Sequence, residues 1–425
     1  MSNFVLVMDT QKKPLTPCKP GTARRLLSAG KAAVYRRYPF TIILTKVVNE
    51  TPESCQLKLD PGSKTTGIAI LKGNQVLWGA NLQHRGQAIK ASLLSRRQLR
   101  RSRRSRKTRY RQPRFLNRTR PNGWLPPSLQ HRASTVITWV NRLRRFCAIN
   151  IVAQELVRFD TQSIQNPEIS GAEYQQGELA GYEVREYLLE KWGRECAYCG
   201  EKDIPLEIEH IQPQSKGGSN RVSNLTLACR PCNQAKGNQA VADFLSGKPN
   251  LLTHILKQSQ APLKDAAAVN STRWVLFNAL KVTGLPVQTG TGGQTKFNRC
   301  RLKLPRDHWL DAACVGEVKS LELLTSQSLQ IKATGHGTRQ MCRTDKLGFP
   351  KRYVPRHKFV RGFQTGDIVR ADVPKGKKAG THVGRVAVRS TGSFNISTTN
   401  GLVQGINAKY CRKVHRKDGY AYSFG

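Results

Sequence analysis

The chain has 425 residues and carries 71 Lys and Arg against 27 Asp and Glu, which gives a formal net charge of +44 and a pI near 10.5. A positive excess of this size is typical of a protein that binds nucleic acid. An anionic membrane is the alternative partner. The sequence contains no run of about 20 apolar residues and no signal-peptide core, so we expect no membrane contact. The length predicts two or more domains.

The first fifty residues predict a small basic module. Residues 4–8 (FVLVM) form a strand, PLTP follows at 14–17, and a short basic helix ends at Gly30 before strands at 32–36 and 40–47. A packing module and an RNA-contacting module both fit this pattern, and the sequence leaves the choice open.

Residues 56–82 predict three strands, at 56–60, 66–72 and 75–81. Asp60 ends the first strand, and Gly62 lets the chain turn tightly beside it. A carboxylate in this place, followed by an antiparallel hairpin, is how ribonuclease-H-like folds present their first metal ligand. Asp-Pro-Gly is also a common turn sequence, so the pattern alone leaves a plain turn open.

An arginine-rich stretch follows, with fourteen Lys or Arg and no acid between residues 86 and 120, inside a segment (61–154) without any carboxylate. Good helix formers predict one helix over about 86–111, which ends near Gln112-Pro113 and spans roughly 39 Å. From Arg100 the helix is basic all round, so a surrounding polyanion would remove its self-repulsion. A solvated or disordered basic segment is the alternative. The candidate nucleic-acid contacts are Arg96, Arg97, Arg100, Arg101, Arg103, Arg104, Arg106, Lys107, Arg109 and Arg111.

Residues 132–149 have helical apolar spacing, and residues 149–153 form a strand with Glu155 just past its end. The polar segment 161–181 predicts a loop, and a helix at 182–192 leads to Trp192.

Residues 196–237 hold two CxxC pairs, Cys196/Cys199 and Cys229/Cys232, among eleven cysteines whose other members are scattered. Four thiolates satisfy a closed tetrahedral zinc site, and zinc suits a small module with little apolar core. The scattered remainder indicates a reducing compartment without a disulfide framework.

Between and after the pairs stand Glu209, His210, Asn224 and Asn233, and the whole segment resembles an HNH (ββα-metal) nuclease module. The resemblance implies that His210 is the general base, that Glu209 and Asn233 hold one Mg²⁺, and that Asn224 fixes the histidine and its loop. A neutral imidazole can take a proton near pH 7, and Mg²⁺ prefers oxygen ligands. A purely structural zinc ribbon is the alternative.

Residues 241–280 predict helices, and a glycine-rich loop runs from Thr289. That loop lacks the GxxxxGK[ST] pattern of a phosphate-binding loop. His308 and Asp311 follow, three residues apart, so on a helix they share a face and can point at one metal pair. An ordinary helix start with Asp307 as N-cap is the alternative.

Taken together, Asp60, Glu155, His308 and Asp311 resemble the three-part constellation of a RuvC-like nuclease, with the HNH module between the second and third parts. This order closely resembles the IscB family of transposon-encoded RNA-guided nucleases, although PLTP stands where that family usually shows PLMP. The resemblance implies an α/β fold: a ribonuclease-H-like (RuvC) core split in three, an arginine-rich bridge helix and a zinc-stapled HNH insert. The expected divisions are an N-terminal PLMP-like module (1–52), RuvC-like parts (53–84, 125–185, 246–320), the bridge helix (85–124), the HNH module (186–245) and a C-terminal interacting region (321–425).

The resemblance also implies a structured guide RNA (ωRNA) and a double-stranded DNA target with a short flanking motif. The HNH site would cut the guide-paired strand, and the RuvC-like site would cut the displaced strand with Asp60, Glu155, His308 and Asp311 holding Mg²⁺. We expect a monomer within a ribonucleoprotein, in the prokaryotic cytoplasm near the nucleoid.

The last hundred residues resemble the family less. Short β-like runs in 366–425 predict a small β-barrel that would read the flanking motif. Residues 331–360 would contact the guide RNA, with phosphate contacts from Lys351, Arg352, Arg356 and Lys358 and stacking by Tyr353 and Phe359. A solvated basic face is the alternative.

Two other functions stay open on the sequence alone. A protein-only HNH/RuvC-type endonuclease would need its own base-reading element, and nothing beyond the arginine run looks like one. A non-catalytic RNA-binding regulator of a transposon would be favoured if a candidate carboxylate or histidine were missing, and none is.

Overall fold

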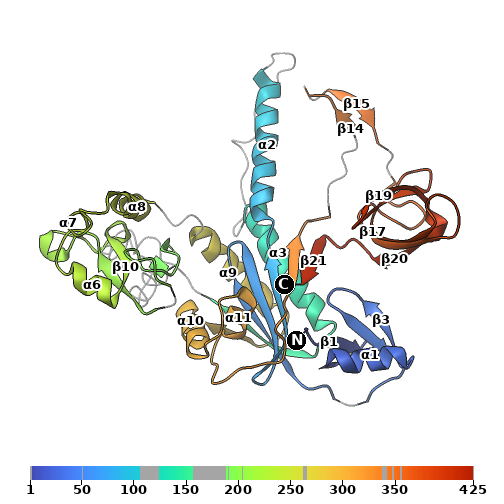
Figure 1. Cartoon of the computed structure of the whole chain (residues 1–425), viewed down its shortest axis with the longest axis horizontal. Coiled ribbons are helices and arrows are strands. Elements are labelled where there is room, and N and C mark those ends of the chain that lie inside the picture. Colours follow the sequence, from blue (N-terminus) through green and yellow to red (C-terminus); the bar gives the residue numbers. More distant parts are fainter. Residues whose placement is uncertain are drawn as a thin grey trace. The chain divides into compact units, whose positions relative to one another are not determined.

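The structure is a computed structural model that describes residues 2–49, 51–105, 124–156, 188–189, 191–202, 204–261, 266–336, 342–346, 349–354 and 357–424, with backbone only at 103, 104 and 266–271. The chain forms two compact units (Figure 1). The first consists of Met1–Cys55, Leu77–Ile149 and Leu323–Gly425, and the second of Gln56–Val76 and Asn150–Glu322. In the described part of the chain, no helix is both long enough and apolar enough to cross a membrane.

The first unit begins with a four-stranded sheet in the order β2-β1-β4-β3. Its elements are β1 (Val5–Met8), β2 (Pro14–Cys18), α1 (Pro20–Ser28), β3 (Ala32–Arg36) and β4 (Thr41–Leu44). Strands β1, β3 and β4 and helix α1 are the predicted elements, whereas β2, which contains the PLTP segment, was not predicted as a strand. Buried Val5, Val7 and Ile42 form the core of this module.

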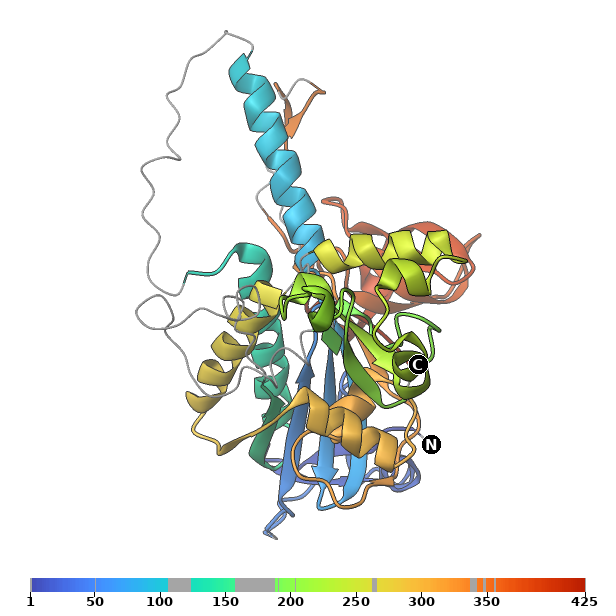
Figure 2. The same ribbon diagram turned by 90° about the vertical axis from the view of Figure 1, so that its left-hand side faces the viewer.

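Two helices of the first unit, α2 (Gly86–Ser105) and α3 (Pro127–Arg144), contact each other. Figures 1 and 2 show α2 as one continuous helix. The predicted helix is therefore confirmed up to residue 105, its expected end near Gln112 lies outside the described residues, and its role as a bridge helix stays a prediction. Helix α3 starts five residues before the predicted 132, because Pro127 occupies the first helical turn, where its missing N–H costs nothing.

The C-terminal part of the first unit is all β. An antiparallel hairpin, β14 (Cys342–Thr344) and β15 (Pro350–Tyr353), precedes a five-stranded antiparallel sheet in the order β19-β18-β17-β16-β20. Its strands are β16 (Ile368–Val373), β17 (Gly380–Ala387), β18 (Ser393–Thr398), β19 (Gly401–Asn407) and β20 (Cys411–His415). The 3-10 turn η4 (Ala408–Tyr410) joins β19 to β20. The predicted short strands are confirmed, and closure into a barrel stays a prediction.

The last strand does not join that small sheet. Strand β21 (Tyr420–Phe424) pairs antiparallel with β13 (Leu329–Ala333), which runs parallel to β7 (Gln75–Gln83). The two-residue strand β12 (Glu322–Leu323) also pairs with β7.

The second unit contains four strands in the order β11-β8-β5-β6. They are β5 (Cys55–Pro61), β6 (Thr65–Lys72), β8 (Ile149–Glu155) and β11 (Val287–Gly290). Strands β5 and β6 form the predicted antiparallel hairpin, whereas β8 and β11 run parallel. Glu155 is the last residue of β8, two residues later than the predicted strand end.

Three helices accompany these strands: α9 (Ala266–Lys281), α10 (Gly292–Arg301) and α11 (His308–Ala313). The predicted glycine-rich loop from Thr289 is wrong, because this segment forms the end of β11 and then α10. Thr291 caps α10 by accepting a 3.2 Å hydrogen bond from the Gln294 backbone N–H. This cap satisfies a helix donor that would otherwise lack a partner.

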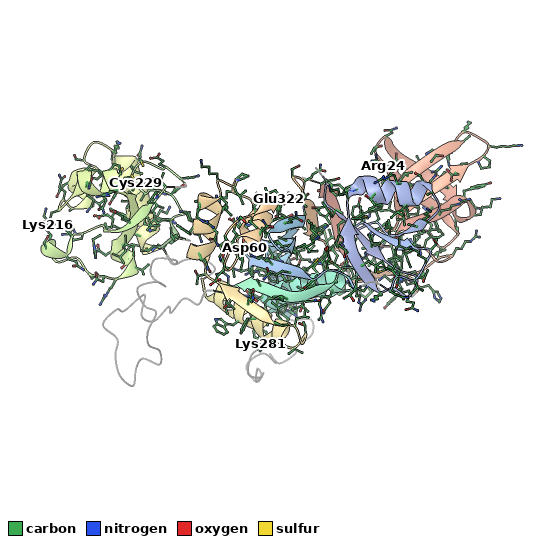
Figure 3. The ribbon with its side chains drawn as sticks, turned by 90° about the horizontal axis from the view of Figure 1, so that it is seen from below. Arg24, Asp60, Lys216, Cys229, Lys281 and Glu322 are labelled. Carbon is green, nitrogen blue, oxygen red and sulfur yellow. The ribbon has the colours of Figure 1, made fainter. Side chains whose placement is uncertain are left out.

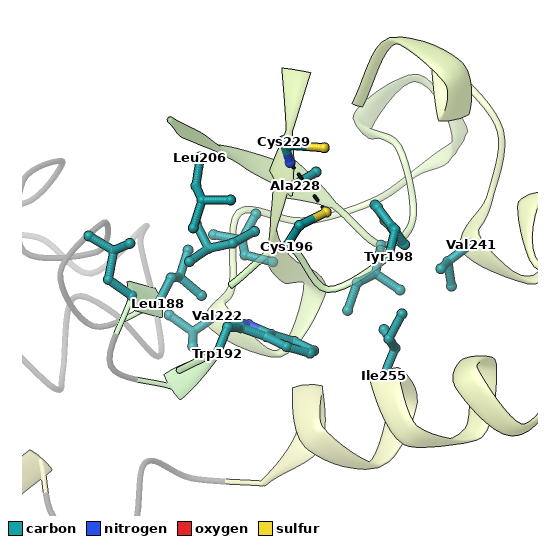
Figure 4. Packing of buried hydrophobic residues seen from close by; sticks show 14 of the residues in the cluster. Leu188, Trp192, Cys196, Tyr198, Leu206, Val222, Ala228, Cys229, Val241 and Ile255 are labelled. Atoms are coloured by element: carbon teal, nitrogen blue, oxygen red, sulfur yellow. Dashed lines mark hydrogen bonds between the residues drawn. The ribbon is translucent and has the colours of Figure 1, made fainter. Parts of the chain in front are cut away.

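The segment with the two CxxC pairs also belongs to the second unit. It contains a hairpin of β9 (Leu206–His210) and β10 (Leu225–Cys229) followed by the short helix α6 (Arg230–Lys236), with η2 (Gln214–Lys216) and η3 (Val222–Asn224) in the connecting loop. Helices α7 (Val241–Phe244) and α8 (Pro249–Gln260) follow. Buried Trp192, Tyr198 and Ile255 belong to its core (Figure 4). Of the predicted helix 182–192, residues 182–187 and 190 lie outside the described part.

Candidate metal and active sites

The four cysteines of the two CxxC pairs converge. The sulfur atoms of Cys196, Cys199, Cys229 and Cys232 all lie within 4.8 Å of one another, and those of Cys199 and Cys229 are 3.8 Å apart. Four ligands about 2.3 Å from zinc in a tetrahedron would be separated by roughly 3.8 Å, so the cluster fits zinc. No other group of three or more potential ligand side chains of this kind occurs among the residues that the structure describes.

One thiol of this cluster is prepared for the thiolate form. Burial raises the pKa of Cys196, but the backbone N–H groups of Cys229, Cys199 and Tyr198 outweigh it, and the pKa falls to about 7. The bond from the Cys229 N–H to the Cys196 sulfur measures 3.3 Å and is drawn in Figure 4. Metal binding requires deprotonated sulfur, so these donors favour it.

His210 ends β9 and is half-buried, opposite Leu225 at the start of β10. The loop that follows is fixed by Asn224. Its side-chain oxygen accepts from the Gln212 N–H (2.9 Å), and its amide nitrogen donates to the carbonyls of Gln212 (2.9 Å) and Ser219 (2.8 Å). Asn224 thus holds the loop, as predicted, but it makes no direct hydrogen bond to the His210 ring.

The His210 ring instead meets two side chains that the sequence did not single out. Its Nε2 lies 2.8 Å from Oδ1 of Asn220 and 3.4 Å from Nε2 of Gln214. Gln214 also donates to the same Asn220 oxygen. The only sequence signal was the presence of amide side chains in the loop after the histidine.

The predicted Mg²⁺ ligands Glu209 and Asn233 each have a protein partner. The ammonium of Lys236, which is fully buried, pairs with Oε1 of Glu209. The amide nitrogen of Asn233 donates a 2.7 Å bond to Glu207. No described residue hydrogen-bonds to Oε2 of Glu209 or Oδ1 of Asn233, so these two oxygens suit a hard cation such as Mg²⁺.

A second site lies on β5, where Asp60 (Figure 3) is near the start of α11. Nδ1 of His308 is 3.7 Å from Oδ2 of Asp60. The neighbouring Asp60 carboxylate raises the pKa of His308. This approach depends on Gly67 of β6, because a Cβ at Gly67 would lie 1.7 Å from the backbone oxygen of His308.

The other two predicted ligands of this site are paired with buried arginines. Arg273 of α9 donates a 2.8 Å bond from Nη2 to Oε1 of Glu155, and its Nε bonds to the carbonyl of Pro61. Nε of Arg299 on α10 is 2.9 Å from Oδ1 of Asp311. Sequence reasoning missed both arginines, which lie far from their partners along the chain.

Asp311 is the perturbed carboxyl group of the second site. Burial and the negative charge of Asp60 raise its pKa to about 6, although Arg299 opposes this. Two carboxylates that resist joint ionisation are typical of a site that accepts a cation. The carboxylate oxygens and the His308 nitrogen fit Mg²⁺ chemistry, although these residues do not form a compact ligand group by themselves.

The basic surface predicted for nucleic acid is exposed where the structure describes it. Four of the predicted contacts on α2 have exposed side chains: Arg96, Arg97, Arg100 and Arg101. Two others, Arg103 and Arg104, are described only by their backbone. The remaining four, Arg106, Lys107, Arg109 and Arg111, lie outside the described residues. In the C-terminal part, Lys351, Arg352 and Lys358 are exposed, and Tyr353 and Phe359 are 74% and 44% exposed. Arg356 lies outside the described residues.

Comparison with known proteins identifies two regions. Residues 5–177 match the model of the RRXRR protein family, and residues 196–239 match the HNH endonuclease family. The two matches are consistent with an IscB-like protein. The IscB resemblance inferred from the sequence is confirmed, and the HNH match supports a nuclease.

Among solved structures, the IscB-like chain is similar to Streptococcus thermophilus Cas9 in complex with the GGAA PAM, at 12% identity over 61% of this chain and 32% of that chain, with a TM-score of 0.22. The same Cas9 with the AGGA PAM matches at 13% identity over 62% and 32%, with a TM-score of 0.24. The chain therefore spans about a third of the length of these structures. No curated protein matches it.

Proposed function

We propose that this IscB-like protein is an RNA-guided DNA endonuclease that hydrolyses phosphodiester bonds with Mg²⁺. The observation that supports the proposal is the presence of two separate clusters of candidate catalytic side chains in one chain. One is His210 beside Glu209 and Asn233 in the HNH module, and the other is Asp60 beside His308 and Asp311. Two sites suit the two strands of a DNA target.

At the HNH site, His210 would take the proton of the attacking water, because a neutral imidazole is a suitable base near pH 7. Glu209 and Asn233 would hold Mg²⁺, which supplies stabilisation of the charge on the leaving oxygen. Lys236 keeps Glu209 in place and neutralises part of its charge. We assign the guide-paired strand to this site.

At the second site, Asp60, Glu155, His308 and Asp311 would hold the cations that stabilise the attacking and leaving oxygens of the displaced strand. Arg273 pairs with Glu155 and Arg299 pairs with Asp311, which orients both carboxylates. This division of labour between the strands follows the IscB resemblance.

The exposed arginines of α2 support guidance by RNA. Every described side chain from Leu94 to Ser102 is exposed, and this stretch contains five basic or amide side chains and no acid. A polyanion along this face would offset the mutual repulsion of its charges. A structured guide RNA (ωRNA) would fill this role, with base pairing to the target strand supplying sequence specificity and the C-terminal part reading a short flanking motif. The working form would be one chain with one RNA.

The assignment is tested by strand-resolved cleavage of a labelled duplex with the purified ribonucleoprotein. His210→Ala should abolish cutting of the guide-paired strand alone, and Asp60→Ala should abolish cutting of the displaced strand alone. Loss of both cuts in either variant would contradict the two-site assignment.

Two further outcomes would favour the alternative functions. Full cleavage after the RNA has been removed with a ribonuclease would favour the protein-only endonuclease. RNA binding without any cleavage would favour a regulator.

A further inference from the structure

The loop after His210 brings two amide side chains to one edge of the imidazole. The short contact is the one between His210 Nε2 and Oδ1 of Asn220, at 2.8 Å. Gln214 Nε2 lies 3.4 Å from the same ring nitrogen, beyond the usual range of a hydrogen bond between such atoms. Gln214 donates to the Asn220 oxygen as well, which fixes the orientation of the Asn220 amide.

This contact selects the tautomer of the histidine. An amide oxygen can only accept a hydrogen bond, so the Nε2 atom facing it must carry the proton. In the neutral ring the lone pair then resides on Nδ1. Among the described residues, none hydrogen-bonds to Nδ1 of His210, which leaves this nitrogen available to a water molecule.

The loop is built to hold Asn220 where it is. Asn224 ties the two ends of the loop together through Gln212 and Ser219, next to Asn220. Gly218 packs so closely that a Cβ there would lie 1.8 Å from the Gln212 carbonyl oxygen. The Asn220 side chain is therefore carried by a loop with few alternative conformations.

We propose that Asn220 is a positioning residue of the HNH site, which orients His210 and fixes the tautomer whose Nδ1 accepts the proton of the attacking water. The inference rests on the proposed nuclease function and on His210 as its base. In the step itself, the water oxygen bonds to phosphorus, the bond from phosphorus to the leaving oxygen breaks, and the water proton passes to Nδ1. In this role Asn220 acts through the His210 ring and needs no contact with the substrate.

The experiment measures guide-strand cleavage by the full ribonucleoprotein from pH 5 to 9. Asn220→Ala removes the acceptor, so single-turnover cleavage should slow about ten- to a hundredfold while substrate binding is unchanged. Asn220→Asp keeps an acceptor of similar size but adds a charge that favours the imidazolium. It should therefore recover most of the rate at high pH, and the acidic limb of its pH profile should move up by roughly one pH unit.

Ser215→Ala is the matched control. Ser215 lies in the same loop as Asn220, but its hydroxyl donates to Oδ1 of Asn238 (2.6 Å), beyond α6, and does not bond to His210. It should leave the pH profile in place. If Asn220→Asp shifts no limb and both Asn220 variants behave as Ser215→Ala does, the inference is overturned while the nuclease proposal stands. If His210→Ala cleaves the guide-paired strand normally, the proposed HNH chemistry itself is wrong.

Discussion

The Nζ atom of Lys58 donates a 2.8 Å hydrogen bond to the carbonyl oxygen of Val315 and a 3.3 Å bond to that of Ala313. Lys58 is only 4% exposed, and burial lowers its pKa to about 8. Lys58 and Asp60 are two residues apart on β5 and therefore point to the same face. The same face of β5 therefore contacts both ends of α11. Asp60 lies near His308 at the start of the helix, and Lys58 bonds to carbonyls at and just after its end.

Replacing Lys58 by Met keeps the aliphatic stem and removes both bonds, which leaves the two buried carbonyls unsatisfied. We expect a loss of about 1–3 kcal/mol in the free energy of unfolding. Displaced-strand cutting should slow because α11 carries His308 and Asp311, and guide-strand cutting should persist. Strand-resolved nicking and chemical denaturation measure the two effects. Lys64→Met, at an exposed site nearby, is the control, and equal behaviour of the two variants would contradict this role.

Gly67 is the position where α11 rests on β6. Gly67→Ala should push the helix away, because the new Cβ would meet the His308 backbone oxygen at 1.7 Å. A thermal shift to lower temperature and a selective loss of displaced-strand cutting are expected. Gly247→Ala, where nothing lies within 4 Å of the added Cβ, should change neither. Wild-type displaced-strand cutting by Gly67→Ala would argue against α11 as part of that site.

Cys229→Ser tests the zinc cluster. Serine does not replace a thiolate ligand well, so the purified protein should contain less zinc, and the transition of the HNH module should move to lower temperature. Metal analysis and calorimetry measure these changes. Cys300→Ser, at an exposed cysteine outside the cluster, should keep full zinc content. Unchanged zinc in Cys229→Ser would contradict a four-cysteine site.

Asp418 provides a pH-dependent contribution to the first unit. It accepts bonds from Arg142 (2.9 Å) and Arg36 (3.2 Å), and also from Tyr422. Burial alone would raise its pKa, but bonds from His415 and Tyr422 and the charge of Arg142 lower it to about 2. The native state therefore favours the ionised form.

Because the folded pKa lies below the ordinary value of 3.8, the stability from Asp418 is present above about pH 4 and is lost as the pH falls through about 2. The contribution is about 2 kcal/mol. Asp418→Asn should lower the unfolding free energy at pH 6 and flatten its decline on acidification, measured by urea unfolding at several pH values. Asp243→Asn, at an exposed position, is the control. A decline as steep in Asp418→Asn as in the wild type would refute this assignment.

The features that depend on short stretches of sequence could be predicted. Asp60 at the end of an alternating strand and the basic run up to residue 105 follow from neighbouring residues, and the structure places both in the expected elements. The two CxxC pairs are also visible in the local sequence, and their sulfur atoms lie together in the structure. The glycine-rich segment after Thr289 misled the prediction, because a Thr291 cap and contacts with the rest of the unit outweigh the low helix propensity of two glycines.

The partners of the candidate ligands could not be predicted in the same way. Arg273 meets Glu155 across 118 positions of the chain, and Lys236 meets Glu209 across 27. Nothing in the local sequence of either cation distinguishes it from the many exposed lysines and arginines of this chain. Only the packing of α9 and α6 against their strands brings these charges together.

RNA-directed cleavage can be tested by changing the RNA. The RNA that co-purifies with the protein is sequenced, its variable segment is replaced, and cleavage of a plasmid pool is mapped with the reassembled ribonucleoprotein and Mg²⁺. If RNA directs cleavage, the cut sites move to sequences complementary to the new segment, next to a constant short motif. Cut sites that stay where they were, or cleavage that needs no RNA, would contradict guidance by RNA.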